Sequence, residues 1–130
     1  MLIAFRDLRV WIALAAASTL GIVSAFTEAP WEDEIFSLRA FRSLEGYRFI
    51  PVSFLWMRVG GLLDDDFVFL RLWSFLPFLV GLVLAWRVVV VSGGTPQDAG
   101  WTVLVLATNP FLVTEARNLR YYGMFFCVAM

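Results

Sequence analysis

Histidine and lysine are absent from the sequence, and it has a single cysteine, Cys127. Without histidine, the common zinc sites and nucleophile activation of the Ser-His-Asp type are excluded. A lone cysteine leaves no disulfide framework within the chain, so cysteine usage says nothing about the redox compartment. The ten basic residues are all arginines, and the formal net charge is −1. No basic patch is present to neutralise phosphates, so we expect no nucleic-acid partner.

Apolar residues, by contrast, are abundant. Hydrophobic residues make up 61% of the chain and aromatic residues 17%, and the mean hydropathy is +0.79. A water-soluble domain of this size cannot bury so much apolar surface. At about 20 residues per transmembrane span, the chain has room for several spans. The composition therefore predicts a multi-pass integral membrane protein.

Four apolar segments are predicted to span the membrane: about 10–26, 67–91, 101–114 and 121–130. Arg6 and Arg9 precede the first span, which places the N-terminus in the cytoplasm of an inner-membrane protein. A signal peptide cleaved after Val23-Ser24-Ala25 is the competing interpretation. We favour an uncleaved span because further spans follow. The chain is still apolar at Met130, so we expect it to be the N-terminal piece of a longer protein.

The segment between the first two predicted spans, 27–66, is expected outside the cell and is rich in acids. Apolar residues recur every three positions in its first part, which predicts an amphipathic helix in the membrane interface, ended by Gly46: Ile35, Leu38, Phe41 and Leu44. Pro51 begins a second apolar stretch, 52–63, which is too short to span. We expect it to form an interfacial or re-entrant helix that Gly60-Gly61 stops. The predicted fold is therefore all-α: a polytopic transmembrane helical bundle with juxtamembrane amphipathic helices in the first external loop.

Two local patterns mark the connections near the third span. Ser92-Gly93-Gly94 predicts a cytoplasmic turn, and Thr95-Pro96-Gln97-Asp98 predicts a helix start, with threonine as cap and proline at the first position. The segment 101–114 has only 14 uncharged residues and contains Asn109-Pro110. It can cross only where protein shields its end or the bilayer is thin.

This topology gathers polar residues at the outer face. A carboxylate of the pair Asp33-Glu34 suits general-base chemistry at a hydroxyl. The arginines Arg71, Arg117 and Arg120 suit phosphate, because a guanidinium makes two parallel hydrogen bonds. The simpler alternatives are a solvated acidic loop and headgroup anchors. Asp64-Asp65-Asp66 is a weak metal signal, because consecutive acids lack a partner ligand.

The order of these motifs resembles the N-terminal part of the membrane glycosyltransferases of the GT-C fold, in particular bacterial enzymes related to protein O-mannosyltransferases and to the aminoarabinose transferases of lipid A. That family has an external Asp-Glu motif after its first span, a Pro-Pro motif, an acid-x-x-x-x-R-L-P-S entry into the second span, and an N-P … R-x-x-R-x-Y segment. The counterparts here lie at 31–36, 49–51, 66–74, 109–110 and 117–122.

The resemblance implies sugar transfer, hexosyl or pentosyl, from a polyprenyl-phosphate donor to a glycan, lipid or protein acceptor at the external face. Asp33 matches the family's base, and Glu34 supports it or helps to hold a divalent metal, which some relatives use and others do not. The donor phosphate is expected at Arg71, Arg117 and Arg120. The residues 1–130 correspond to an N-terminal part of the GT-C transmembrane domain and are not expected to be active alone.

The sequence departs from the family pattern in three places. Phe49 stands where the family often has His or Lys, and Arg48 is a candidate for supplying that cation. Ile50 replaces the first proline of the Pro-Pro pair, and Trp73 replaces the proline of Leu-Pro-Ser, a change expected to remove a helix kink and little else. Two further function classes stay open: a transporter or flippase for lipid-linked anions, and a non-catalytic accessory membrane protein.

Overall fold

The computed structural model describes residues 7–27, 39, 51–117, 127 and 129–130, and the side chains of 51–54 and 117 are not among the described atoms. Within these ranges the chain is helical, with no strand. Five helices follow one another: α1 (Leu8–Thr27), α3 (Pro51–Leu63), α4 (Phe67–Val91), α5 (Pro96–Thr108) and α6 (Pro110–Arg117). The predicted all-α class is therefore confirmed for the described residues.

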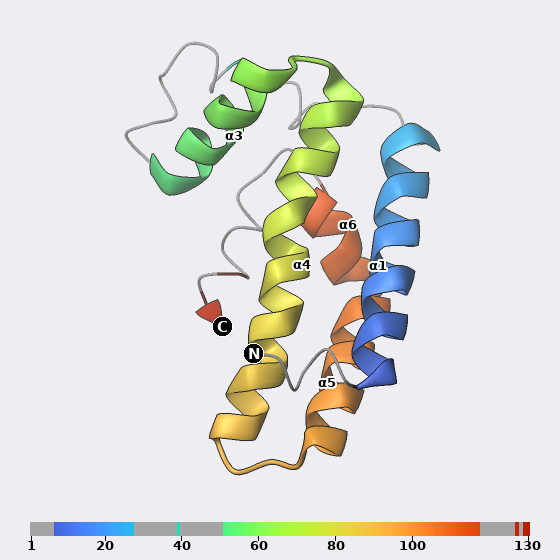
Figure 1. Cartoon of the computed structure of the whole chain (residues 1–130). Coiled ribbons are helices and arrows are strands. Elements are labelled where there is room, and N and C mark those ends of the chain that lie inside the picture. The colour runs from blue at the N-terminus through green and yellow to red at the C-terminus, as the bar shows by residue number, and fades with distance from the viewer. Residues whose placement is uncertain (1–6, 28–38, 40–50, 118–126, 128) are drawn as a thin grey trace.

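Helices α1 and α4 are the two long helices of the bundle. They contain 20 and 25 residues, and among the described residues they are the two helices long and apolar enough to cross a membrane. They coincide closely with the predicted segments 10–26 and 67–91. Figure 1 shows α1 running up the bundle and α4 running down beside it. We call the end that carries α3 the upper end and the opposite end the lower end.

Helices α1 and α5 present small residues to the core. The buried positions of α1 recur mostly every four residues, at Val10, Ala13, Ala17, Gly21 and Ala25, and those of α5 include Ala99, Val103 and Ala107. These faces meet larger side chains of α4, among them Phe75, Phe78 and Leu82. Small residues let helix backbones approach closely, which is a common way to pack helices in membranes.

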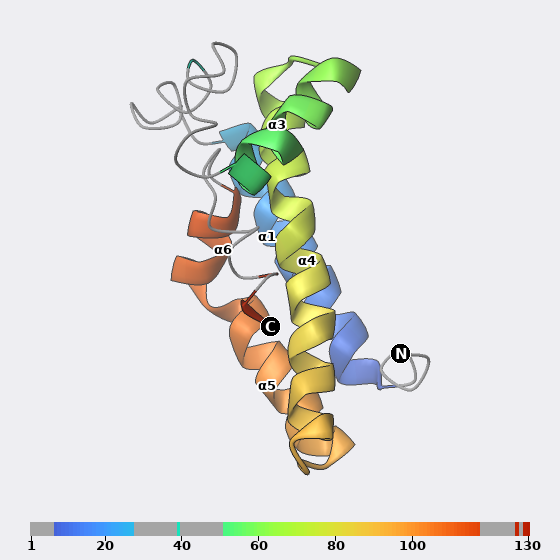
Figure 2. The same ribbon diagram turned by 90° about the vertical axis from the view of Figure 1, so that its left-hand side faces the viewer.

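The third predicted span is not one continuous helix. α5 ends at Thr108, and α6 begins at Pro110. Asn109 separates them because its side-chain oxygen accepts hydrogen bonds from the amides of Phe111 (3.0 Å) and Leu112 (3.2 Å), which caps α6. The following proline has no amide N–H to continue α5. The segment 101–114, predicted as the third span, is thus divided between two helices at Asn109, and Figure 2 shows α6 following α5 along the same side of α4.

The second short helix begins at Pro51 as predicted, but Gly60-Gly61 do not stop it. α3 continues to Leu63. A glycine inside a helix costs about 1 kcal/mol relative to alanine, and here Gly60 lies against α4, where the missing side chain makes room for Trp73. A tertiary contact therefore outweighs the local helix preference. The first predicted amphipathic helix and its cap, Gly46, lie outside the described residues, except Arg39, which is helical and exposed.

Candidate functional site

Most of the predicted site residues lie outside the part of the chain that the structure describes. These are Asp33, Glu34 and Arg120. Arg117 is the last residue of α6, and the position of its side chain is not described. Arg71 is the one predicted site residue with a placed side chain. The site is therefore built here from Arg71 and from the helices that surround it at the upper end.

Arg71 lies inside the bundle, where its side chain is 1% exposed. Its Nη1 donates a hydrogen bond to the backbone oxygen of Ala25, at 3.2 Å, and its guanidinium carbon lies 4.5 Å from the centre of the Phe67 ring. Ala25 belongs to the last turn of α1, whose carbonyls have no donor within the helix. A cation is also favoured there by the helix dipole. Arg71 thus closes the C-terminal end of α1.

Trp73, two residues after Arg71 on α4, contacts α3. Its indole stacks on that of Trp56 from α3, with ring centroids 4.5 Å apart and an angle of 17° between the planes. The two residues also exchange hydrogen bonds. Trp56 Nε1 donates to the Trp73 carbonyl at 3.0 Å, and Trp73 Nε1 donates to the Trp56 carbonyl at 2.8 Å. We call Trp56 and Trp73 the tryptophan pair.

Two residues elsewhere make the tryptophan pair feasible. In a helix the carbonyl of Trp73 would accept from the amide of residue 77, but Pro77 has no amide N–H. That carbonyl is therefore available to Trp56. On the other side, a Cβ at Gly60 would lie 2.5 Å from Cδ1 of Trp73, so only glycine leaves space for the indole.

Sequence reasoning missed the tryptophan pair. The exchange of proline for Trp73 was expected to remove a kink and little else, and that expectation was wrong, because Trp73 fixes α3 to α4. The signals available in the sequence were the two spacings of four residues, from Trp56 to Gly60 and from Trp73 to Pro77. Neither spacing indicates by itself which tryptophan meets which.

The acidic run at the upper end has a structural role in the connection between α3 and α4. Asp66 caps α4, since its Oδ1 accepts from the amides of Val68 (2.9 Å) and Phe69 (3.0 Å). The Oδ1 of Asp64 accepts from the amide of Asp66 at 3.0 Å. Among the described residues, no group of three or more acids, cysteines or histidines is arranged to hold a metal ion. Asp64 and Asp66 of the acidic run therefore shape the start of α4.

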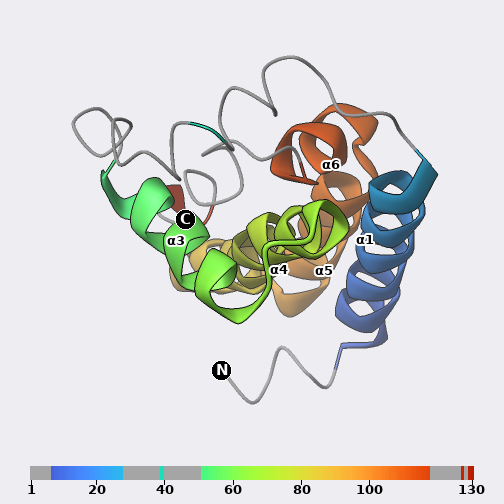
Figure 3. The same cartoon turned by 90° about the horizontal axis from the view of Figure 1, so that it is seen from above.

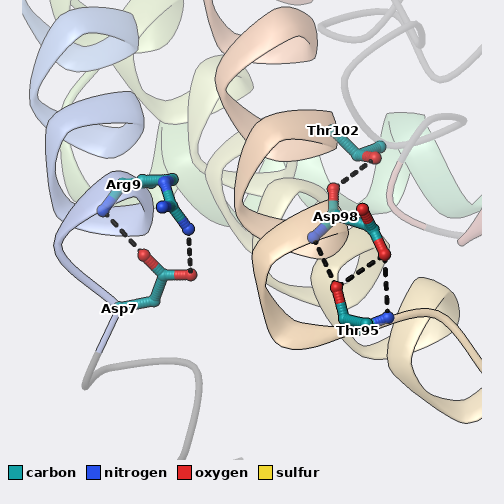
Figure 4. A network of polar contacts seen from close by, with 5 residues as sticks. All are labelled: Asp7, Arg9, Thr95, Asp98 and Thr102. Carbon is teal, nitrogen blue, oxygen red and sulfur yellow. Dashed lines mark hydrogen bonds and ion pairs between the residues drawn. The ribbon is translucent and has the colours of Figure 1, made fainter.

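The lower end carries a second set of polar contacts, drawn in Figure 4. Asp7 caps α1 by accepting from the amide of Arg9 at 2.9 Å, and Arg9 also lies 5.2 Å from the centre of the Trp101 ring. Thr95 and Asp98 form a capping box at the start of α5. That capping arrangement confirms the predicted helix start. The turn at 92–94 is confirmed as well, with Gly93 at φ +93°.

Hydrogen bonds to the side chain and then to the backbone amide of Thr95 lower the pKa of Asp98 below its ordinary value of 3.8. The ionised carboxylate is the form that accepts these bonds. Asp7, Thr95 and Asp98 thus cap helices at the lower end, and Arg9 over the Trp101 ring joins α1 to α5.

Comparison of the chain with protein-family models, with curated proteins and with solved structures found no match. The functional assignment therefore depends on the residues and their arrangement.

Proposed function

We propose that the chain is the N-terminal portion of a membrane glycosyltransferase that transfers a sugar from a polyprenyl-phosphate donor to an acceptor on the external face of the membrane. The observation that carries the proposal is the connection between the two long apolar helices. It leaves α1 and enters α4 at the same end of the bundle, and it contains the Asp33-Glu34 pair. An acidic pair beside lipid, at one end of two apolar helices, suits deprotonation of an acceptor next to a membrane-bound donor.

The proposed topology follows from the charges at the two ends. Arg9 starts α1 and the exposed Arg87 lies near the end of α4, both toward the lower end. Asp64, Asp65 and Asp66 lie at the upper end. Arg6 and Arg9 precede the first span, and the charges that flank the first span usually set the orientation, so we assign the lower end to the cytoplasm and the upper end to the periplasm. α5 and α6 together are then one broken crossing in a polytopic bundle.

In the proposed reaction, the carboxylate of Asp33 takes the proton of the acceptor hydroxyl as its oxygen attacks the anomeric carbon. The bond from that carbon to the phosphate oxygen breaks, and the polyprenyl phosphate leaves with inversion of the sugar. Glu34 supports Asp33 or helps to hold a divalent metal. Arg117 and Arg120 follow the third predicted span and are proposed to bind the donor phosphate, a role that Arg71 shares in the family resemblance.

The test is Asp33→Asn in the full-length protein, assayed in membranes with a panel of polyprenyl-phosphate sugars. Loss of a general base lowers turnover by about 100-fold or more, so we expect transfer to fall at least that far while membrane insertion is unchanged. Asp65→Asn, an exposed acid at the same end, serves as the matched control and should keep its activity. Retained transfer by Asp33→Asn would refute the assignment.

The same membranes, assayed as sealed vesicles, distinguish the glycosyltransferase from the alternative function, a transporter or flippase. If the lipid-linked sugar moves across the bilayer and no glycosylated product forms, the protein is a transporter and not a glycosyltransferase. If the protein neither transfers nor moves any donor of the panel, an accessory role is the remaining alternative.

A further inference from the structure

The outward side of the crossing formed by α5 and α6 changes character at the break between them. Between the first turn of α5 and the break, the exposed side chains are large and apolar, Trp101 at 51% and Val105 at 64%. Side chains of this kind suit contact with lipid tails. Thr108, at the end of α5, is exposed and polar, and so is Asn109 in the break. The change from apolar to polar therefore occurs within one helical turn.

Helix α6 continues this polar side toward the upper end. Val113 and Ala116 are buried in the core, whereas Thr114 and Glu115, which point away from it, are half-buried. Phe111 is exposed beside them. Seen from above in Figure 3, α6 lies at the edge of the bundle next to α1 and α4, with one side turned away from both. Polar groups thus follow the outward side from the break to Glu115.

The break lies deep in the bilayer where α4 crosses the membrane as proposed. α5 contains 13 residues and α4 contains 25, and both adjoin the turn at the lower end. At about 1.5 Å per residue, Asn109 lies about 20 Å above that turn, while α4 extends for about 37 Å. Figure 1 accordingly shows the junction of α5 and α6 close to the middle of α4. Because hydrocarbon fills about 30 Å of a bilayer, the break is near its centre.

At this depth the break leaves backbone groups without their helical partners. The amides of Phe111 and Leu112 donate to the Asn109 side chain. In a continuous helix they would donate to the carbonyls of Ala107 and Thr108, four positions earlier. An unpaired backbone group is costly in hydrocarbon, so non-helical backbone at membrane depth lies against protein or lines water.

Three kinds of surroundings could cover this side of the crossing: lipid, another helix or water. Lipid tails offer no hydrogen bonds to the break. A neighbouring helix can pair with one or two groups at one level, whereas the polar groups from Thr108 to Glu115 extend over about 10 Å and end in a carboxylate toward the upper end. Ionisable residues at membrane depth face the interior of a bundle or a water-filled cavity. Water that is continuous with the upper side solvates all of these groups at once.

We infer that the outward side of the crossing from Thr108 to Glu115, which we call the polar face, lines a water-filled path that opens at the upper end and reaches the break at Asn109. The inference rests on the membrane crossing that is part of the proposed function, and it does not depend on the chemistry proposed for Asp33. A path of this kind gives polar ligands access to the middle of the bilayer from the external side.

Cysteine labelling in sealed, right-side-out vesicles tests the path. In full-length protein that carries Cys127→Ser and has no other cysteine, Thr108→Cys and Thr114→Cys each place one thiol on the polar face. A cationic, membrane-impermeant methanethiosulfonate is added to the external side. The reagent reacts with the thiolate, which an apolar environment disfavours, so we expect both positions to react at least about 100-fold faster than a thiol that faces lipid.

Val80→Cys is the matched control for a thiol that faces lipid. Val80 is 52% exposed and lies on α4 at about the height of Thr108 on α5, about 17 Å above the lower turn. Val105→Cys, one turn below the break, tests how far the path extends, and we expect both controls to react slowly. Labelling of the denatured protein gives the reference rate for each position and shows that the thiol is intact.

Each other outcome overturns a stated part of the inference. If Thr108→Cys reacts as slowly as Val80→Cys, the path does not reach the break and the inference fails. If the polar face reacts only from the cytoplasmic side, its opening at the upper end is wrong. If Val80→Cys or Val105→Cys reacts as fast as Thr108→Cys, the contrast between lipid and water is absent and the inference fails together with the proposed crossing. Transfer that survives in Asp33→Asn refutes the proposed enzyme and leaves the labelling result standing.

Discussion

The two ends of the bundle are built in different ways. At the lower end, the hydrogen bonds of side chains join residues two to four positions apart and are exposed or half-buried, as for Asp7 with Arg9 and Thr95 with Asp98. The upper end also has such a local cap, at Asp66, but in addition it has hydrogen bonds that join residues 17 and 46 positions apart and are half-buried or buried. The hydrogen bonds of the lower end therefore lie within single helices and their caps, and Arg9 over the Trp101 ring joins α1 to α5 there. At the upper end, hydrogen bonds themselves join α1 and α3 to α4.

This difference indicates where the molecule can tolerate change. A helix cap contributes about 1 kcal/mol to the free energy of unfolding, and its loss leaves the packing between helices in place. A buried contact between helices fails together with the packing around it, because removing one partner leaves a buried polar group unpaired. Substitutions at the upper end should therefore cost more than equivalent substitutions at the lower end, and four predictions test this.

The largest effect is expected for truncation of the tryptophan pair. Trp56→Ala removes the stacked ring, its packing and one hydrogen-bond donor. We expect the free energy of unfolding to fall by about 3 kcal/mol. This is the lower part of the range for truncation of a large aromatic side chain, because Trp56 is half-buried. Thermal unfolding in detergent micelles measures it. The coupled circular-dichroism signal of the stacked indoles should disappear as well. At the lower end, Trp101→Ala, which removes an exposed indole, should cost much less, and equal losses would contradict the comparison.

Two glycines provide the next comparison. A Cβ at Gly60 would lie 2.5 Å from Cδ1 of Trp73, and one at Gly100 would lie 2.5 Å from Oδ2 of Asp7. The indole is held on both sides, whereas the Asp7 carboxylate is the far end of a short side chain whose contacts are with the neighbouring Arg9. We expect Gly60→Ala to destabilise the protein by about 1–2 kcal/mol through overpacking. Gly100→Ala should be neutral or slightly stabilising, since alanine favours the helix.

The same unfolding assay measures both glycine variants. Gly61→Ala, at the half-buried neighbour of Gly60, controls for the helix preference of alanine in α3. If Gly100→Ala destabilises the protein as much as Gly60→Ala does, the two ends of the bundle tolerate an added methyl group equally.

A smaller effect is expected from Pro77, through the carbonyl of Trp73. Pro77→Ala restores an amide N–H that can bond this carbonyl within α4. Trp56→Phe should therefore cost about 1 kcal/mol in the natural chain and less in the Pro77→Ala background. A double-mutant cycle of unfolding free energies measures the coupling. As a control, Trp73→Phe breaks the other hydrogen bond of the pair, so its cost should not depend on Pro77. If Trp56→Phe costs the same in both backgrounds, the Trp56 indole and the amide at position 77 do not compete for the carbonyl of Trp73.

The smallest effect is expected at the cap of α5. Thr95→Ala removes the side-chain partner of Asp98 and should cost about 1 kcal/mol at neutral pH. The pKa of Asp98 is lowered in the folded protein, so its contribution is complete above the ordinary value of 3.8 and is lost as the pH falls through the lower, folded value. The difference between Thr95→Ala and the natural chain should therefore shrink in acid. Thr102→Ala, whose hydroxyl bonds only the carbonyl of Asp98 among the contacts described, should show no such pH dependence.

Sequence reasoning performed best where the controlling contacts are local. The helices over 10–26 and 67–91, the turn at Gly93 and the start of α5 were all predicted, because apolar runs, a glycine with positive φ and a Thr-Pro-x-Asp pattern act within a few residues. It failed where local and tertiary preferences compete. Gly60 was expected to end a helix and instead admits Trp73.

For the candidate site, the sequence supplied the residue types and their order along the chain, and Asp33, Glu34, Arg117 and Arg120 stay predictions on that basis. The burial of Arg71 was not predictable, because an arginine near the start of an apolar helix is equally compatible with a headgroup anchor. Its environment is set by the end of α1, which arrives from 46 residues away.

The sequence by itself determined the apolar character of the chain, its helical class and the places where most of its helices begin, since these depend on composition and on contacts between near neighbours. The tertiary structure alone decided that α4 holds α1 through Arg71 and α3 through Trp73. The reason is geometric: which side chains meet depends on how three helices are rotated and placed, and Pro77 and Gly60 take on their roles only once Trp56 has arrived.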